Sequence, residues 1–347
     1  MVYKILMNKS QIKQPKLNFM LMIMLIISTM ITINSTSWIS AWMGMEMNLM
    51  SFIPMMLTKN KIFKSSNSMM SYFMIQSSSS SILLLMIMMN KLEMNFFKIN
   101  MLILFLQLSL LMKLGAAPFH WWTPKIINYL NWKNCFILLT WQKLAPFMMI
   151  SMTKMSNLIY YSIITSSIIG AILGINQTSL KLMILYSSIN HISWMMMSMM
   201  INMLMFMFYF IIYTISIMII CMMLNNLNLN FLNQLLKNNS LNMFNKINVM
   251  MMFLSMAGIP PMIGFLPKFK ILMLMMNNKL MMESMIFILF SLITFLFYMY
   301  PLMSMMLFNK MNSKWNMMKF NLLKNNMLMI LTNLTMSLMM IMPLLYL

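Results

Sequence analysis

Long apolar runs separated by short polar breaks fill the chain from residue 18 to residue 346. About 20 apolar residues in a helix span the hydrocarbon core of a bilayer, so each run is a candidate transmembrane helix. The runs cover 18–34, 38–57, 68–89, 99–130, 134–152, 156–174, 179–200, 202–224, 247–276, 282–308 and 326–346. The pattern therefore predicts an all-α integral membrane protein of about eleven transmembrane helices, in a single polytopic domain covering 1–347.

The fourth and ninth runs are too long for one straight crossing, and each carries helix breakers near its middle. The breakers are Gly-Ala-Ala-Pro at 115–118 and Gly-Ile-Pro-Pro at 258–261. Proline lacks an amide donor and clashes with the carbonyl four residues earlier, so we expect Pro118 to free the carbonyl of Leu114 and Pro260 that of Met256. Broken backbone at membrane depth persists only where protein or a water-filled cavity satisfies it.

The two interrupted runs lie five runs apart, which predicts two five-helix units at 18–152 and 156–308. A basic tail, 1–17, precedes them and a final helix, 326–346, follows. Because five is odd, successive units enter the membrane from opposite sides. Such inverted repeats are typical of transporters, whose ion sites lie beside discontinuous helices near the midplane. The alternative is that two proline-kinked helices fall at matching positions by chance.

Composition supports the membrane class. The chain is 61% apolar and 8% charged, with a mean hydropathy of +0.81, whereas soluble domains carry about 25% charged residues. It has 62 Met and no Arg, which is typical of an AT-rich genome. We therefore interpret methionine clusters such as 195–200 as residues of the lipid-facing surface rather than as a soft-metal site.

The net charge of +21 comes from lysines in the loops, which form no basic face with interleaved aromatics, so nucleic-acid binding is not indicated. With the N-terminus inside, the outside segments hold only Lys91, Lys98, Lys154 and Lys279. The inside segments hold Lys4, Lys9, Lys13, Lys16, Lys59, Lys61, Lys64, Lys125, Lys133, Lys181, Lys237, Lys246, Lys310, Lys314, Lys319 and Lys324. This asymmetry predicts an inside N-terminus.

Among the ionisable residues of the predicted spans, the candidates for proton exchange are Glu46, Lys113, Lys143, His191 and Lys268. A charge at the bilayer centre costs at least about 2.5–3.5 kcal/mol, so such residues usually pair, line a wet cavity or serve transport. Burial disfavours a charged lysine and a nearby carboxylate favours it, so Glu46 and Lys113 could form an ion pair that acts as a switch. A static salt bridge that fixes helix packing is the alternative.

The other three residues also leave two interpretations open. Lys143 precedes Pro146 by three residues, so a freed backbone carbonyl is expected nearby. Lys268 lies off the centre of its run, and it either is buried or snorkels to the surface. His191 can exchange a proton near neutral pH, although a lone histidine in an apolar helix is usually a hydrogen-bonded packing residue. Together the five residues offer a chain of proton-exchange sites.

Recognisable cofactor motifs are missing from the sequence. It contains no GxGxxG, no GxxxxGK[ST] and no iron–sulfur spacing. Cys135 and Cys221 are isolated in apolar surroundings, and His120 and His191 are too few for a two-haem bundle. We expect no metal or cofactor on this chain, so any redox chemistry must occur in another polypeptide.

Five strings in order across residues 41–268 carry a family resemblance: AWMGMEMNLMSFIP, KLGAAPFHWWTP, LTWQKLAPFMMIS, GAILGINQTSLKLMILYSSINHISWMM and GIPPMIGFLPK. They closely resemble the chain 2 family of mitochondrial NADH–ubiquinone oxidoreductase (respiratory complex I). The resemblance implies an antiporter-like subunit of the membrane arm, with eleven helices and the N-terminus on the matrix side of the inner mitochondrial membrane.

On the matching motifs, the resemblance implies that Glu46 is the acid paired with Lys113, that Lys143 is the central lysine, and that Lys268 is the lysine of the second broken helix. It also implies proton translocation driven by quinone reduction in other subunits, which hold the NADH, FMN, iron–sulfur and ubiquinone sites. The expected partners are other membrane-arm and accessory subunits and inner-membrane phospholipid including cardiolipin. The alternative function is a freestanding cation/proton antiporter, which the scarcity of buried carboxylates disfavours.

Overall fold

The protein is described by a computed structural model that covers residues 2–57, 62–91, 99–154, 156–237, 243–260 and 262–311. Within these ranges the chain forms helices and no β-strand, apart from an isolated antiparallel bridge between Ser179 and Phe231. The all-α prediction is confirmed for this part of the chain. The predicted final helix, 326–346, lies outside the described residues.

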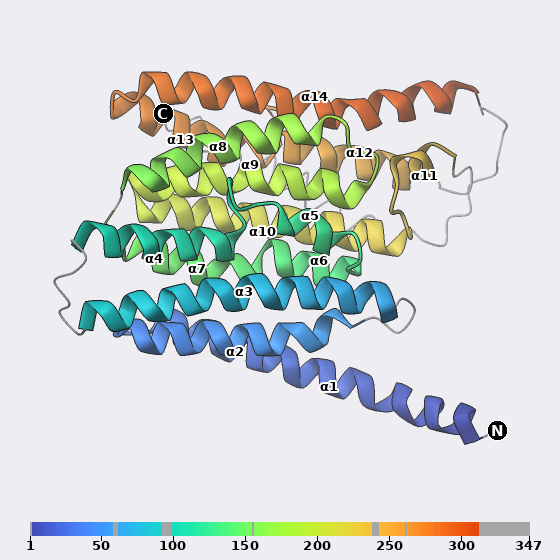
Figure 1. Cartoon of the computed structure of the whole chain (residues 1–347). Coiled ribbons are helices and arrows are strands. Elements are labelled where there is room, and N and C mark those ends of the chain that lie inside the picture. Colours follow the sequence, from blue (N-terminus) through green and yellow to red (C-terminus); the bar gives the residue numbers. More distant parts are fainter. Residues whose placement is uncertain are drawn as a thin grey trace. The chain divides into compact units, whose positions relative to one another are not determined.

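The backbone contacts divide the chain into two compact units (Figure 1). Unit 1 comprises 1–115 and 119–159, and unit 2 comprises 116–118 and 160–347. The helices up to α7 are α1 (Val2–Ile33), α2 (Trp38–Met56), α3 (Ile62–Lys91), α4 (Ile99–Leu114), α5 (Trp122–Ile127), α6 (Trp132–Leu139) and α7 (Trp141–Ser151). The later helices are α8 (Asn157–Gly174), α9 (Leu180–Ile201), α10 (Met203–Asn226), α11 (Leu232–Lys237), α12 (Met243–Ala257), α13 (Phe265–Asn277) and α14 (Met281–Met311).

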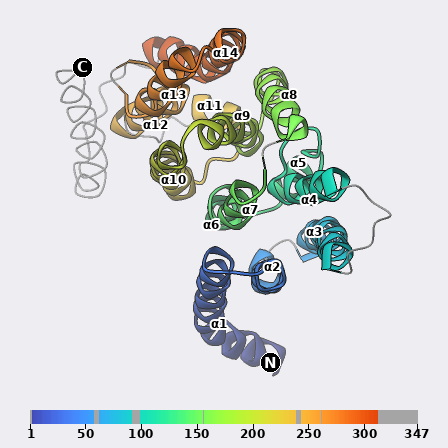
Figure 2. The same cartoon turned by 90° about the vertical axis from the view of Figure 1, so that its left-hand side faces the viewer.

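Unit 1 is a layered packing of neighbouring helices. α2 contacts α1 on one side and α3 on the other, α3 contacts α4 and α5, and α7 contacts α1, α2, α4 and α6 (Figure 2). Small residues allow membrane helices to approach closely. At Gly44 of α2, a Cβ atom would lie 2.5 Å from Thr32 Cγ2 and 3.0 Å from Ser28 O of α1. The absence of a side chain at Gly44 therefore permits the α1–α2 contact.

In unit 2, α9 is buried along nearly its whole length and contacts α10 and α13. Ser179 begins α9 by accepting a hydrogen bond from the Leu182 amide at 3.4 Å, as an N-capping serine does. α14 contacts α11, α12 and α13. At Gly170 of α8, a Cβ atom would lie 2.6 Å from the Asn190 amide nitrogen of α9. The glycine thus brings the backbones of α8 and α9 together.

The predicted helix 134–152 is divided in two, because α6 ends before Thr140 and α7 begins after it. Thr140 Oγ1 donates to the carbonyl of Phe136 at 2.7 Å. Such back-bonding from a threonine to the carbonyl four residues earlier often bends helices. Pro146 lies inside α7, and the helix continues through it. α11 is a further short helix that the apolar pattern did not predict.

Four described helices are long and apolar enough to cross a membrane by length and composition. They lie at Ser65–Asn90, Asn157–Gly174, Met203–Asn226 and Met281–Met303. Many methionines on these helices are exposed, including Met70 and Met74 of α3. The run that begins at Met195 is an exception to the expected lipid-facing placement, because Met195, Met196 and Met197 are buried on α9. Proximity to other helices, rather than residue type, decides which methionines face outward.

Candidate functional site

The first predicted interruption is present, and side chains bind two of the carbonyls at the end of α4. α4 ends at Leu114, and Gly115 follows with φ of 68°, a conformation that only glycine adopts readily. Trp122 Nε1 donates to the carbonyl of Met112 at 3.2 Å, and Gln76 Nε2 donates to that of Lys113 at 3.3 Å. Side chains from α5 and α3 thus satisfy carbonyls that the end of a helix leaves open.

Lys113 lies in the last turn of α4 with a side chain that is only 7% exposed. Its Nζ donates to Met45 Sδ of α2 at 3.9 Å, and a thioether is a weak acceptor. Glu46, the next residue of α2, is half-buried and acts on Lys113 by Coulomb attraction. Glu46 thus lies near Lys113, while the hydrogen bond of the ammonium is to the neighbouring methionine.

Lys143 lies in the first turn of α7 and is 5% exposed. Its amide donates to the carbonyl of Thr140 at 3.1 Å, so the α6–α7 division lies directly before it. The residue beside it, Gln142, donates from Nε2 to Asn48 Oδ1 of α2 at 2.9 Å. Tyr72 of α3 donates to Gln142 Oε1 at 3.4 Å. Three helices therefore meet through polar side chains next to Lys143.

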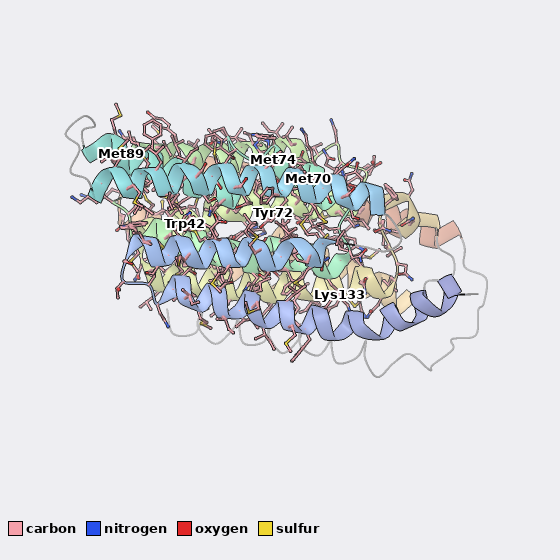
Figure 3. The ribbon with its side chains drawn as sticks, turned by 60° about the horizontal axis from the view of Figure 1, so that its bottom comes forward. Trp42, Met70, Tyr72, Met74, Met89 and Lys133 are labelled. Atoms are coloured by element: carbon pink, nitrogen blue, oxygen red, sulfur yellow. The ribbon has the colours of Figure 1, made fainter. Side chains whose placement is uncertain are left out.

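Asn48, Tyr72 and Gln142 form a polar group that the apolar pattern did not predict. Figure 3 shows Tyr72 between the ribbons of α3 and α2, where its ring lies 5.4 Å from that of Phe52 and 6.0 Å from that of Trp122. The signal that could have found them is an amide side chain within an apolar span, since polar groups there usually have a partner. No sequence pattern shows which of the many serines, asparagines and glutamines contact each other.

The second predicted interruption is built differently. α12 ends at Ala257, Gly258 has φ of 82°, and α13 begins at Phe265. Lys268 of α13 is 6% exposed, and its Nζ donates to the carbonyls of Ala257 at 3.0 Å and Met256 at 3.5 Å. The carbonyl of Met256, which Pro260 was expected to free, therefore accepts from a lysine. Lys268 is buried and does not snorkel.

Two glycines permit this arrangement. A Cβ atom at Gly258 would lie 3.1 Å from Lys268 Nζ, so the bare backbone leaves room for the ammonium. A Cβ atom at Gly264 would lie 1.8 Å from the carbonyl oxygen of Ser255. The connection between α12 and α13 therefore folds back tightly against the last turn of α12.

His191 of α9 is buried among tyrosines of α10. Its Nδ1 lies 2.7 Å from Tyr209 OH, and its ring centroid lies 5.2 Å from that of Tyr213. A hydrogen bond at Nδ1 fixes the orientation of the ring and the nitrogen that remains for other contacts. This geometry fits both a packing histidine and a proton-exchanging one, and α9 also contacts α13, which carries Lys268.

Other polar residues of the spans have structural partners. Gln107 of α4 is fully buried, and its Nε2 donates to Thr153 Oγ1 at 3.2 Å and to the Lys154 carbonyl at 2.6 Å, while its Oε1 accepts from Ser156 Oγ. It therefore fastens the segment that follows α7. Each hydroxyl of the serine run 77–81 donates to the carbonyl three residues earlier, which fits a packing role.

The predicted residues thus form two sets. Glu46, Lys113 and Lys143 belong to unit 1, and His191 and Lys268 belong to unit 2. In each unit an interrupted helix carries or directly precedes a buried lysine.

Buried lysines beside discontinuous helices, in a chain that is all-helical over its described residues, are typical of the class of antiporter-like membrane proteins. In agreement, the family described as "NADH:quinone oxidoreductase/Mrp antiporter, TM" matches residues 35–294. Among individual proteins, NADH-ubiquinone oxidoreductase chain 2 of Aedes aegypti is 41% identical over 318 residues, covering 91% of this chain and 93% of the relative. That of Anopheles gambiae is 37% identical over 317 residues, covering 89% and 90%. The chain belongs to the NADH-ubiquinone oxidoreductase chain 2 family.

Solved structures share the fold at low sequence identity. A chain of respiratory complex I from Thermus thermophilus superposes with a TM-score of 0.75 at 15% identity, covering 83% of this chain and 70% of that one. A chain of the Mrp complex from Dietzia gives a TM-score of 0.71 at 12% identity, covering 82% and 59%.

Proposed function

We propose that this chain is the proton-translocating core membrane subunit of NADH:ubiquinone oxidoreductase, which couples quinone reduction elsewhere in the complex to proton pumping. The observation that carries the proposal is the burial of Lys113 and Lys268 beside interrupted helices, in a chain whose relatives are named as subunits of that oxidoreductase. A charged group held away from water is unfavourable unless it is paired or hydrogen-bonded. Its protonation therefore responds to a change in a neighbouring charge.

In the proposed mechanism, opening and closing of the Glu46–Lys113 pair shifts the proton affinity of Lys143 and then of Lys268, with His191 as an intermediate exchange site. The weak thioether contact of Lys113 supports a movable ammonium, since little is lost when it leaves Met45. The proximity of Glu46 supplies the charge that draws it away. A weak present contact together with a nearby opposite charge is what a switch requires.

The proposal includes the finer architecture. The two five-helix units, 18–152 and 156–308, are related by inversion, and the final helix completes eleven spans. The division of backbone contacts between residues 159 and 160 supports a boundary near the predicted one. The lysine asymmetry places the N-terminus, with its tail 1–17, on the matrix side of the inner mitochondrial membrane.

The proposed surroundings follow from the family. Other membrane-arm and accessory subunits cover part of the apolar surface, and phospholipid including cardiolipin covers the rest. NADH, FMN, iron–sulfur clusters and ubiquinone bind to other subunits. The chain itself supplies proton-exchanging side chains and the helices that hold them.

The test is replacement of Lys143 by methionine in the assembled complex, reconstituted in proteoliposomes. Methionine keeps most of the side-chain volume and removes the ammonium. We expect the complex to assemble and the ratio of protons pumped to electrons transferred to fall. Lys133→Met is the matched control, because Lys133 lies on α6 of the same unit but is exposed.

An unchanged proton-to-electron ratio in Lys143→Met would contradict the proposal. The likeness to the Mrp complex chain makes a freestanding cation/proton antiporter the competing function. That function predicts cation-driven proton exchange by the purified chain alone in vesicles, which the proposal does not.

A further inference from the structure

The polar group formed by Asn48, Tyr72 and Gln142 connects the neighbourhoods of the two unit 1 charge sites. Asn48 lies two residues after Glu46 on α2, and Gln142 lies one residue before Lys143 on α7. The 2.9 Å bond from Gln142 Nε2 to Asn48 Oδ1 therefore joins the turn that bears the acid to the turn that bears the lysine. Asn48 is 4% exposed, so water does not compete freely for this bond.

The first turn of α7 depends on such contacts for its position. α6 and α7 are separate at Thr140, so the turn containing Lys143 is not fixed by an uninterrupted helix before it. Of the two side chains that precede Lys143 on α7, Trp141 has a buried Nε1 without a hydrogen-bond partner among the described residues. Gln142 has two polar partners, Asn48 and Tyr72, on two other helices. It is therefore the side chain that ties this turn to α2 and α3.

We propose that the Gln142–Asn48 hydrogen bond is the positioning link through which the state of the Glu46–Lys113 pair reaches Lys143. The inference rests on the proposed function of the chain as a proton translocator. Amide side chains do not gain or lose protons near neutral pH, so the pair transmits position and not a proton. When Lys113 moves between Met45 and Glu46, the position of α2 shifts at these residues. The Gln142–Asn48 hydrogen bond then transmits this shift to the first turn of α7.

Tyr72 keeps the link in one geometry. Its hydroxyl donates to Gln142 Oε1, which leaves Gln142 Nε2 to donate to Asn48. Its ring is held by Phe52 of α2 and Trp122 of α5. Trp122 also donates to the carbonyl of Met112, one residue before Lys113. The neighbouring rings of Tyr72 and Trp122 therefore bind two sites: Trp122 binds the interrupted end of α4, and Tyr72 binds Gln142.

The experiment compares four variants of the assembled complex in proteoliposomes: Gln142→Leu, Asn48→Leu, the double variant of both, and the exchanged pair Asn48→Gln with Gln142→Asn. A hydrogen bond contributes about 1 kcal/mol, equivalent to about a fivefold change in an equilibrium. We expect each leucine variant to lower the proton-to-electron ratio about fivefold. The double variant should be no worse than either single one, because both remove the same interaction.

The exchanged pair is the decisive measurement. It preserves the summed length of the two side chains, so the hydrogen bond between the two amide groups can form again across the same distance. We expect it to recover most of the proton-to-electron ratio that Gln142→Leu loses. A role in packing alone predicts no such recovery of the ratio, and a failure to recover it would overturn the inference.

Gln107→Leu is the matched control. Gln107 is also a buried glutamine of unit 1, but its partners lie in the segment after α7. We expect it to lower the amount of assembled complex while the proton-to-electron ratio of the remainder stays normal. If Lys143→Met lowers the ratio and Gln142→Leu does not, the positioning link is wrong and the proposed function stands. If Lys143→Met also leaves the ratio unchanged, both fail.

Discussion

The two interrupted helices both leave backbone carbonyls without intrahelical partners, but their lysines differ in whether they bind those carbonyls. At the first interruption, Lys113 precedes the break, and neutral side chains from Gln76 and Trp122 satisfy the last carbonyls of α4. At the second, Lys268 follows the break, and its ammonium itself binds the last carbonyls of α12. Cations are favoured at the carbonyl end of a helix, where the helix dipole is negative.

The difference separates a movable charge from a structural one. Lys113 can leave Met45 without breaking a hydrogen bond to the backbone, because its ammonium donates to a thioether and not to a carbonyl. Lys268 cannot leave Met256 and Ala257 without leaving their carbonyls short of a donor. We therefore expect Lys113 to change partners readily and Lys268 to move only together with its broken helix.

The largest expected effect contrasts the glycines of the two breaks. Gly264→Ala would place a Cβ atom 1.8 Å from the backbone oxygen of Ser255, which cannot move without unfolding the end of α12. We expect a loss of more than about 4 kcal/mol, in the range of exceptional single substitutions, and no assembled complex. Native gel electrophoresis of solubilised membranes measures this directly.

Gly115→Ala is the counterpart at the first break. Its Cβ atom would lie 2.6 Å from Thr123 Cγ2, a side-chain atom, at a φ of 68°. We expect a smaller loss of about 1–2 kcal/mol, mainly from the left-handed backbone. Adding Thr123→Ser should relieve part of it. Equal loss of assembly in Gly115→Ala and Gly264→Ala would show that the two breaks are equally rigid.

The next effect contrasts the lysines themselves. Lys268→Met removes the donor to two carbonyls, and hydrogen bonds to charged groups contribute about 1.5–3 kcal/mol. We expect a clear fall in the thermal midpoint of the purified complex for Lys268→Met and little change for Lys113→Met. Differential scanning fluorimetry on matched preparations compares them. A larger fall for Lys113→Met would reverse the assignment of movable and structural lysine.

The smallest expected effect concerns the contacts at the first break, at the end of α4. Gln76→Leu removes the donor to the Lys113 carbonyl, and hydrogen bonds between membrane helices average about 0.6 kcal/mol. We expect a slight fall in the thermal midpoint.

Met45→Leu, which keeps the side-chain volume, should cause no measurable fall because a thioether accepts only weakly. A strong destabilisation by Met45→Leu would mean that Lys113 is held in place and is no switch.

The interruptions show how far local sequence can be read. A glycine followed within three residues by proline marks both breaks, so both could be predicted from residues 115–118 and 258–261. The division at Thr140 could not, because threonine is common within helices and bends them only where its hydroxyl bonds to a carbonyl. Pro146 lies inside α7, which continues through it, so a proline alone does not locate a break.

The sequence by itself determined the membrane class, the all-helical character of the described chain and the burial of Lys113 and Lys143, whereas the burial of Lys268 was settled only by the structure. The length of an apolar run and the cost of an unpaired charge in the membrane interior are properties of single segments, so they can be predicted from the sequence of each segment. Only the tertiary structure decided that Gln142 bonds to Asn48, that Lys268 binds the end of α12, and that the Met195 run is buried. Those facts depend on which helices meet, and side-chain contacts between distant segments leave no trace in the spacing of apolar residues.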